Sequence, residues 1–206
     1  TWGAAVTALT TQAYSQGKMS MAIINGNPAL AFKSDNVPGF SSGLFYTRAT
    51  DANGAAWGGW VTVAVSAVGS LVDVSMATVN ARPAIAYRQS TNLYYVRASD
   101  ANGTAWGAPI RVTNTTSQGG ASPAKLSLAV VSGNPAIGFM AHDERLKYIR
   151  ASNADGSLWA SNAVNVDIST TASGGHPVLA VINGAPAIVY TRSHVDGARY
   201  IRANDS

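Results

Sequence analysis

Three histidines and five acidic residues are the side chains of this sequence best suited to chemistry. They are His142, His176, His194, Asp35, Asp73, Asp143, Glu144 and Asp196. Histidine exchanges a proton near neutral pH, and histidine with carboxylates can bind zinc. No metal-site spacing such as His-Glu-x-x-His connects them, and the nucleophile pattern Gly-x-Ser-x-Gly is absent. We therefore predict no catalytic residue and no metal ligand from these patterns.

These side chains lie within a sequence that repeats itself. Four tryptophans, four prolines and four Tyr-x-Arg-Ala tetrads recur with one period of about fifty residues. They are Trp2, Trp57, Trp106 and Trp159; Pro28, Pro83, Pro135 and Pro186; and tetrads beginning at Tyr46, Tyr95, Tyr148 and Tyr200. Three markers with one period predict a single domain, 1–206, of four copies. The copies run approximately over 1–56, 57–105, 106–158 and 159–206.

Each copy contains four short segments typical of β-strands. In the first copy they are Ser20–Ile24, a segment starting at Pro28, Leu44–Ala49 and Trp60–Val65. Their apolar, aromatic and β-branched residues favour strands, and Asn-Gly pairs supply the positive φ of a tight hairpin. The second copy has Asn80-Ala81 in place of Asn-Gly, so we expect a different turn there.

A four-stranded antiparallel unit repeated around an axis is the blade of a propeller. The sequence therefore predicts an all-β, four-bladed β-propeller. A β-sandwich is the alternative fold, but it leaves four equal copies unexplained.

The two ends of the sequence suggest how such a ring closes. The last copy ends on its third strand, and the sequence begins with the fourth-strand pattern around Trp2. We expect the N-terminal strand to complete the last blade, which would cover the open strand edges. The alternative is an eight-bladed ring of two chains, each lending its tryptophan strand to the other.

The turn between the third and fourth strands resembles a known motif. The stretches Thr50–Trp57, Ser99–Trp106 and Ser152–Trp159 are similar to the Asp-box, or bacterial neuraminidase repeat, of sialidase-type propellers. That motif reads Ser-x-Asp-x-Gly-x-Thr-Trp, and its Ser/Thr, Gly and Trp fall in register here. Its Asp position is held by Ala52, Ala101 and Ala154, with acidic or amide residues one place to either side.

The resemblance implies an element of fold and not an activity, because the box is structural and remote from catalysis in that family. Sialidases also need about six blades, an arginine triad, a tyrosine nucleophile and acidic partners. The tetrad arginines Arg48, Arg97, Arg150 and Arg202 are equivalent by repeat, so they do not form such a triad.

Residues present in every copy are expected to build the blades. The four tryptophans are interpreted as packing anchors, and the four tetrad arginines as buried stems with heads on turn carbonyls or carboxylates. The alternatives are four aromatic platforms for sugars and a ring of arginines that binds an anion.

Binding is expected where the copies differ. In a propeller the two-to-three and four-to-one loops share one face, and these loops vary strongly here. The candidate ligand-binding residues on this variable face are Tyr14, Asp35, Phe40, His142, Asp143, His176, His194 and Asp196. Carboxylates there would bind sugar hydroxyls, and Tyr14 or Phe40 would stack on a sugar ring.

Composition narrows the class of protein. The chain has 206 residues, 12% charged, with net charge +4 and no cysteine. Scattered basic residues argue against nucleic-acid binding, and no apolar run approaches the roughly 20 residues of a membrane helix. Disulfides and thiolate metal sites are excluded. We expect an extracellular or cell-surface protein.

We predict a non-enzymatic binding or interaction module, lectin-like, for a glycan or a protein. The alternatives are a structural scaffold or assembly unit of a larger exported protein, and a glycosidase- or lyase-type enzyme. The enzyme requires two carboxylates about 5–10 Å apart. We expect no cofactor, although an ion could be held by carbonyls in the axial channel, and either a monomer or a homodimer.

Overall fold

The computed structural model describes residues 1–9, 19–35, 38–39, 42–66, 71–114, 125–141, 145–167, 176–191 and 197–205. Its regular elements are β-strands that form four separate antiparallel sheets. The prediction of an all-β fold built from four copies is therefore confirmed. Over this described part of the chain, no helix has the length and apolar character needed to cross a membrane.

The first three sheets each contain four strands in sequence order. They are β1 (Met19–Ile24), β2 (Asn27–Ser34), β3 (Ser42–Arg48) and β4 (Val61–Ser66); β5 (Leu71–Val79), β6 (Arg82–Gln89), β7 (Asn92–Arg97) and β8 (Ile110–Asn114); and β9 (Leu126–Val131), β10 (Asn134–Met140), β11 (Leu146–Arg150) and β12 (Val164–Asp167). The fourth sheet has three strands, β13 (Val178–Ile182), β14 (Ala185–Thr191) and β15 (Ala198–Arg202).

The turns between first and second strands show why these hairpins form. Asn25 and Gly26 take φ of 45° and 81°, which Asn and Gly tolerate. Asn80 and Ala81 take φ of 45° and 61°. The expectation of a different turn in the second copy is therefore wrong, since Ala81 adopts the same left-handed conformation despite its Cβ.

This strained alanine leads to a prediction. The left-handed conformation costs a residue that carries a Cβ about 1–2 kcal/mol. Ala81→Gly removes the Cβ and so relieves this strain. Part of that gain is offset by the greater freedom of glycine in the unfolded chain. We expect the free energy of unfolding to rise by about 0.5–1 kcal/mol in a urea titration. The matched variant Ala77→Gly, within β5, should instead lose about 0.5–1 kcal/mol, and a loss in both would contradict the strain argument.

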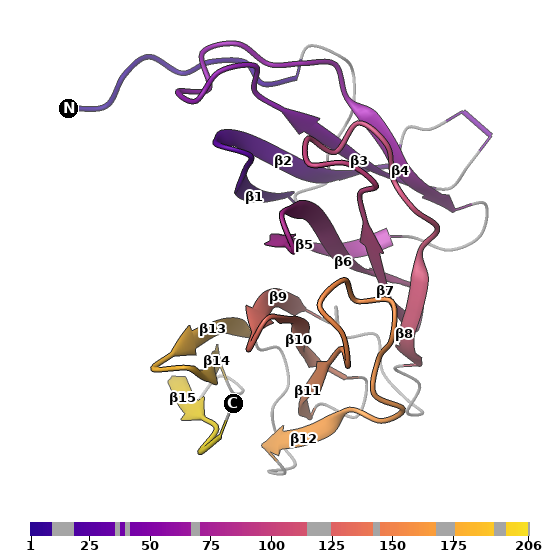
Figure 1. The fold of residues 1–206 in the computed structure, drawn as a ribbon, viewed down its shortest axis with the longest axis vertical. Coiled ribbons are helices and arrows are strands. Elements are labelled where there is room, and N and C mark those ends of the chain that lie inside the picture. Colours follow the sequence, from indigo (N-terminus) through magenta and orange to yellow (C-terminus); the bar gives the residue numbers. More distant parts are fainter. Residues whose placement is uncertain are drawn as a thin grey trace.

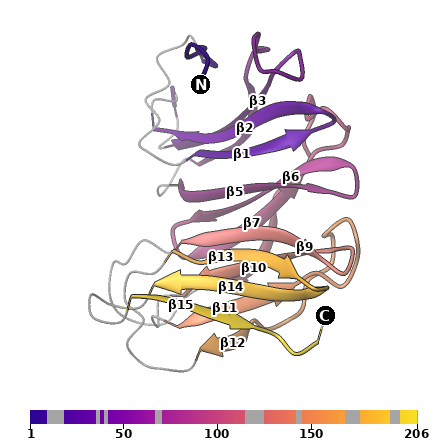
Figure 2. The ribbon, with the colours of Figure 1, turned by 90° about the vertical axis from the view of Figure 1, so that its left-hand side faces the viewer.

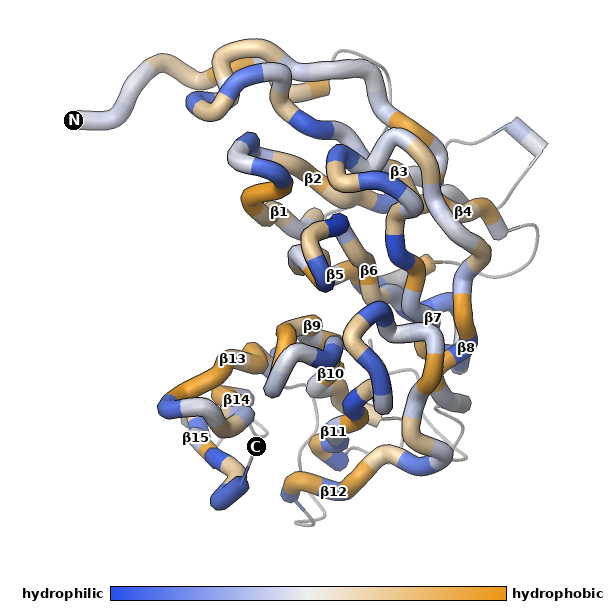
Figure 3. Tube along the Cα trace, viewed as in Figure 1, coloured by the Kyte–Doolittle hydropathy of each residue, from blue (hydrophilic) through white to orange (hydrophobic). Residues whose placement is uncertain are grey.

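The four sheets follow one another around an arc (Figure 1). The first strands of consecutive sheets, β1, β5, β9 and β13, contact one another in that order. They form the inner edge of the arc, where β1, β9 and β13 are strongly hydrophobic (Figure 3). Each sheet therefore rests mainly on the next one in the sequence.

The predicted closure of the ring is not present in this structure. The fourth sheet keeps three strands, and Trp2 is fully exposed. Figure 1 shows the N-terminal segment near the first sheet, at the opposite end of the arc from β15. Because the arc holds its two ends apart, the N-terminal segment does not pair with β15 as we expected.

A serine hydrogen bond joins the innermost strands at the same point of each interface. The backbone N–H of Met76 donates to Ser20 Oγ at 2.9 Å, that of Leu128 to Ser75 Oγ at 3.0 Å, and that of Leu179 to Ser127 Oγ at 3.0 Å. The repeated bond fixes neighbouring sheets in one register.

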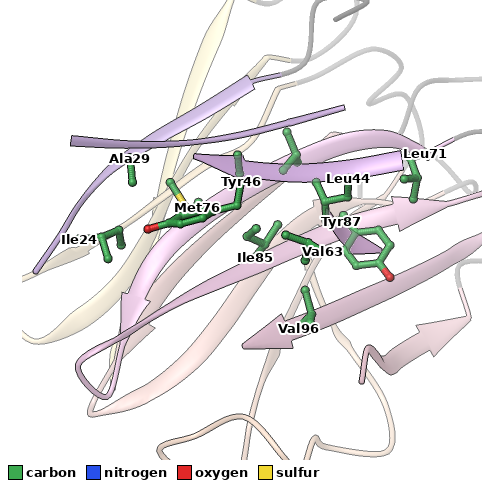
Figure 4. Packing of buried hydrophobic residues seen from close by; sticks show 12 residues of the cluster. Ile24, Ala29, Leu44, Tyr46, Val63, Leu71, Met76, Ile85, Tyr87 and Val96 are labelled. Carbon is green, nitrogen blue, oxygen red and sulfur yellow. The ribbon is translucent and has the colours of Figure 1, made fainter. Parts of the chain in front are cut away.

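A tyrosine from each sheet packs on a tryptophan of the next. Tyr46 meets Trp106 edge to face, with ring centroids 5.3 Å apart, and donates its hydroxyl to the Asn102 carbonyl at 2.9 Å. Tyr95 repeats this with Trp159 and the Asp155 carbonyl. Figure 4 shows Tyr46 among the buried side chains of the first two sheets. Burial raises the pKa of both phenols, so they stay protonated donors.

Candidate functional site

The two faces of the arc differ in character. The one-to-two turns lie on one side, and the strand ends that lead to the variable loops lie on the other (Figure 2). The turn face holds residues common to all copies.

The tetrad arginines donate hydrogen bonds to the one-to-two turns of their own sheets. Arg48 donates from Nε to the Ile24 carbonyl at 2.9 Å and from Nη2 to the Asn25 carbonyl at 2.8 Å. Arg97 and Arg202 make the same pair of bonds in the second and fourth sheets. These contacts correspond to the structural interpretation of the arginines.

The polar groups of the tryptophan hairpins also form hydrogen bonds within their own hairpins. Trp57, Trp106 and Trp159 each donate the indole N–H to a glycine carbonyl three residues earlier. Asp100 accepts the N–H groups of Asn102, Thr104 and Ala105. Partial burial raises the pKa of Asp100, but these bonds and one from the Thr104 hydroxyl outweigh it and hold that pKa at about 2. Hydrogen bonds within the turn face therefore engage the three indole N–H groups and the Asp100 carboxylate.

A polar rim crosses the variable face at the innermost strands. The rim is formed by one position of the repeat, two residues before the serine position of each innermost strand. This position holds Asp73 on β5, Lys125 before β9 and His176 before β13. Asp73 Oδ2 accepts the backbone N–H of Leu126 at 2.7 Å, which links the second sheet to the third. Lys125 Nζ contacts His176 Nε2, which links the third to the fourth.

Asp73 is the carboxylate of this rim, and the fold orients it through the neighbouring strand and the neighbouring sheet. It lies directly opposite Arg88 in the pairing of β5 with β6. Arg88 is buried, and burial lowers the pKa of its guanidinium while the charge of Asp73 raises it. Asp73 thus sits between a guanidinium and a backbone N–H, which is an environment for an ionised carboxylate.

A second polar group joins the third and fourth sheets on the same face. Tyr190 on β14 donates its hydroxyl to Asp167 Oδ2, at the end of β12, at 2.5 Å. Arg199 lies opposite Tyr190 on β15. Burial raises the pKa of Tyr190, and its bond to the Asp167 carboxylate raises it further.

The predicted ligand-binding residues are only partly described. Asp35 is exposed at the end of β2 and pairs with Lys33 at 2.8 Å, and His176 lies on the rim beside Lys125. The others lie outside the described residues: Tyr14, Phe40, His142, Asp143, His194 and Asp196. Within the described ranges no three His, Asp or Glu side chains come together as a metal site.

Sequence reasoning missed Lys125, Arg88, Asp167 and Tyr190. Aligning the first strands on Ser75 and Ser127 would have placed Asp73, Lys125 and His176 at one position and revealed the rim. Arg88, Asp167 and Tyr190 carry no such signal, because their partners come from other strands.

No family model and no curated protein matches this sequence. Solved structures do match it. An endo-arabinase from Bacteroides thetaiotaomicron aligns at 11% identity over 95% of this chain and 78% of its own, with a TM-score of 0.55. An α-L-arabinofuranosidase from Podospora anserina aligns at 13% identity over 96% and 68%, with a TM-score of 0.61.

A sialidase from Trypanosoma rangeli aligns at 13% identity over 90% of this chain and 37% of its own, with a TM-score of 0.56. The arrangement of four antiparallel sheets around a common inner edge and these alignments indicate the same fold. The fold is of the β-propeller type. This supports the resemblance to sialidase-type propellers at the level of the fold.

The prediction of a non-enzymatic binding module, with a scaffold as its alternative, is corrected by this comparison. Solved structures that align with this chain include enzymes, namely an endo-arabinase, α-L-arabinofuranosidases and a sialidase. The repeat pattern misled the prediction because uniform blades hide the singular residues of the rim.

Proposed function

We propose that this propeller is the sugar-cleaving unit of a glycosidase-type enzyme, with its active site at the rim of the innermost strands on the variable face. The observation that supports this most directly is the placement of Asp73. It is a carboxylate on an innermost strand, oriented by the Leu126 N–H and opposite the buried Arg88. The names of the structural neighbours support carbohydrate as the substrate class.

Glycosidases cleave through a transition state with positive charge on the sugar ring, served by two carboxyl groups. Asp73 suits the ionised role, as nucleophile, base or electrostatic stabiliser. The second carboxyl group is expected on the same face, where the sequence has Asp143 and Glu144 before β11, outside the described residues. Lys125 and His176 supply donors for sugar hydroxyls next to Asp73.

The test is hydrolysis of a panel of aryl glycosides and polysaccharides that includes α-L-arabinofuranosides, arabinan and sialosides. We expect the wild type to release sugar from one class, and Asp73→Asn to lower kcat/KM about a hundredfold or more. The matched control is Asp51→Asn, whose carboxylate binds N–H groups of its own hairpin on the opposite face. It should leave kcat/KM unchanged.

Two outcomes would contradict the proposal. The first is a folded wild type that hydrolyses nothing in the panel. The second is hydrolysis in which Asp73→Asn and Asp51→Asn behave alike, which would place the site away from the rim.

A further inference from the structure

The first sheet exposes Met19 and Met21, whose positions in the repeat are buried in the other sheets. Met21 on β1 is 69% exposed, whereas Leu128, at the same position of the repeat, is 6% exposed. Met19 and Ile23, on the same side of β1, are exposed as well. We call Met19, Met21 and Ile23 the head face.

The fourth sheet shows the same feature on its opposite side. Ile182 is 42% exposed, whereas its equivalent Ile24 in the first sheet is 0% exposed. Val178, Val189 and Tyr200 are exposed beside it, and Val189 pairs with both Val178 and Tyr200. We call Val178, Ile182, Val189 and Tyr200 the tail face.

The internal interfaces indicate what covers these faces. Wherever two sheets meet, the head side of one packs on the tail side of the sheet before it, as Met76 packs in one cluster with Ile24 and Tyr46. The head face and the tail face are therefore the two halves of one further interface of the same kind. They lie at opposite ends of the open arc, so this structure does not bring them together (Figure 1).

A cavity between the third and fourth sheets, on the side of the fourth sheet opposite the tail face, has the surroundings of a tryptophan site. It measures about 420 Å³ and is lined by Tyr148, Arg150, Ile188, Ala203 and Asp205, among others. At the corresponding places in the two preceding interfaces, Trp106 packs on Tyr46 and Trp159 on Tyr95.

The hydroxyl of Tyr148 is the second sign of an incomplete interface. It is buried and has no hydrogen-bond partner among the described residues, whereas Tyr46 and Tyr95 donate to the hairpin of the following sheet. Trp2 is fully exposed in the single chain and packs on no tyrosine of the described residues.

The tail face also differs from its internal counterparts in a way that suits association. Val178 replaces the serine of the other three sheets, and Val189 replaces Ala31, Ala86 and Gly138. Both changes add apolar surface, so burial of this face is driven by the hydrophobic effect without the serine hydrogen bond.

We propose that two copies of this chain join head to tail, each tail face covered by the head face of the other copy. The segment around Trp2 of one copy fills the cavity beside Tyr148 of the other. Since each contact uses two different surfaces, two such contacts close a ring of two chains. Every exposed apolar strand face described above is buried in that ring.

The proposal is tested by light scattering after gel filtration, using single substitutions on each face. The wild-type chain of 21.2 kDa should elute with the mass of two chains. Met21→Asp on the head face and Ile182→Asp on the tail face should each give one-chain mass with a folded circular-dichroism spectrum, since both residues are exposed in the single chain. The control Thr62→Asp, exposed on the outer strand β4, should keep the two-chain mass.

Mixing the two face variants gives the decisive result. Met21→Asp keeps an intact tail face and Ile182→Asp an intact head face, so the mixture should form a mixed pair that neither variant forms alone. Pairing through one shared surface cannot restore association in this way. Trp2→Ala should weaken pairing of the otherwise unchanged chain about thirtyfold.

A wild type of one-chain mass at high micromolar concentration would overturn the proposal, as would masses that grow without limit. Failure of the mixed variants to pair would overturn the head-to-tail arrangement.

Discussion

The Gly103→Ala variant is expected to lose about 3 kcal/mol of unfolding free energy. Gly103 has φ of +77°, and an added Cβ would stand 2.5 Å from Tyr46 Cε1 and 3.0 Å from Pro83 Cγ. The left-handed conformation costs alanine about 1–2 kcal/mol, and displacing a packed side chain costs about 1–3 kcal/mol. Tyr46 cannot yield easily, because it is held by Trp106 and by its bond to the Asn102 carbonyl.

Gly54 provides the matched control for this variant. It has φ of +71° at the same position of the repeat, but the nearest atom to its added Cβ is Pro28 Cγ at 3.5 Å. In the Ile182→Asp background, which keeps the chain single, Gly54→Ala should therefore lose only the conformational part, about 1–2 kcal/mol. Urea unfolding followed by tryptophan fluorescence measures both, and equal losses would show that the contact with Tyr46 does not matter.

The second large effect is expected from a buried innermost strand. Leu128→Ala removes a side chain packed between the second and third sheets and should lower the unfolding free energy by about 3 kcal/mol. The cost combines lost apolar burial with the cavity left behind.

Met21→Ala is the control for that substitution, because Met21 holds the same repeat position on the exposed head face. Its effect should stay within about 0.5 kcal/mol. Both variants are best made in the Ile182→Asp background, which keeps the chain single. A loss above 2 kcal/mol for Met21→Ala would mean that the head face is buried within one chain.

Much of the fold could be predicted from the sequence because each repeated marker has a local task. Asn25-Gly26 supplies the turn, and Pro28 stands near the start of the second strand. The closure could not be predicted in this way. How far each sheet turns against the next depends on side-chain volumes across the interface, such as the Tyr46–Trp106 contact, and the period of the repeat does not contain that information.

The candidate site was predictable only in part. The sequence marked Asp73 as suited to chemistry and His176 as a variable-face residue, yet the surroundings of Asp73 depend on Arg88 across the sheet and on Leu126 in the next sheet. Such partners are set by register and by packing between sheets. The functional prediction was wrong because it rested on loop composition, which does not distinguish a binding module from an enzyme.

The serine bonds at Ser20, Ser75 and Ser127 tie each sheet to one successor. In a chain organised in this way each sheet contacts only the sheets next to it. One sheet can therefore unfold without disturbing sheets that it does not contact. In the single chain, no strand of the described residues pairs with the outer edge of β15, so its amides should exchange with deuterium first. Protection should then rise toward β6 and β10, which are flanked by neighbouring strands and sheets. The molecule would therefore unravel from its C-terminal end inward, one unit at a time.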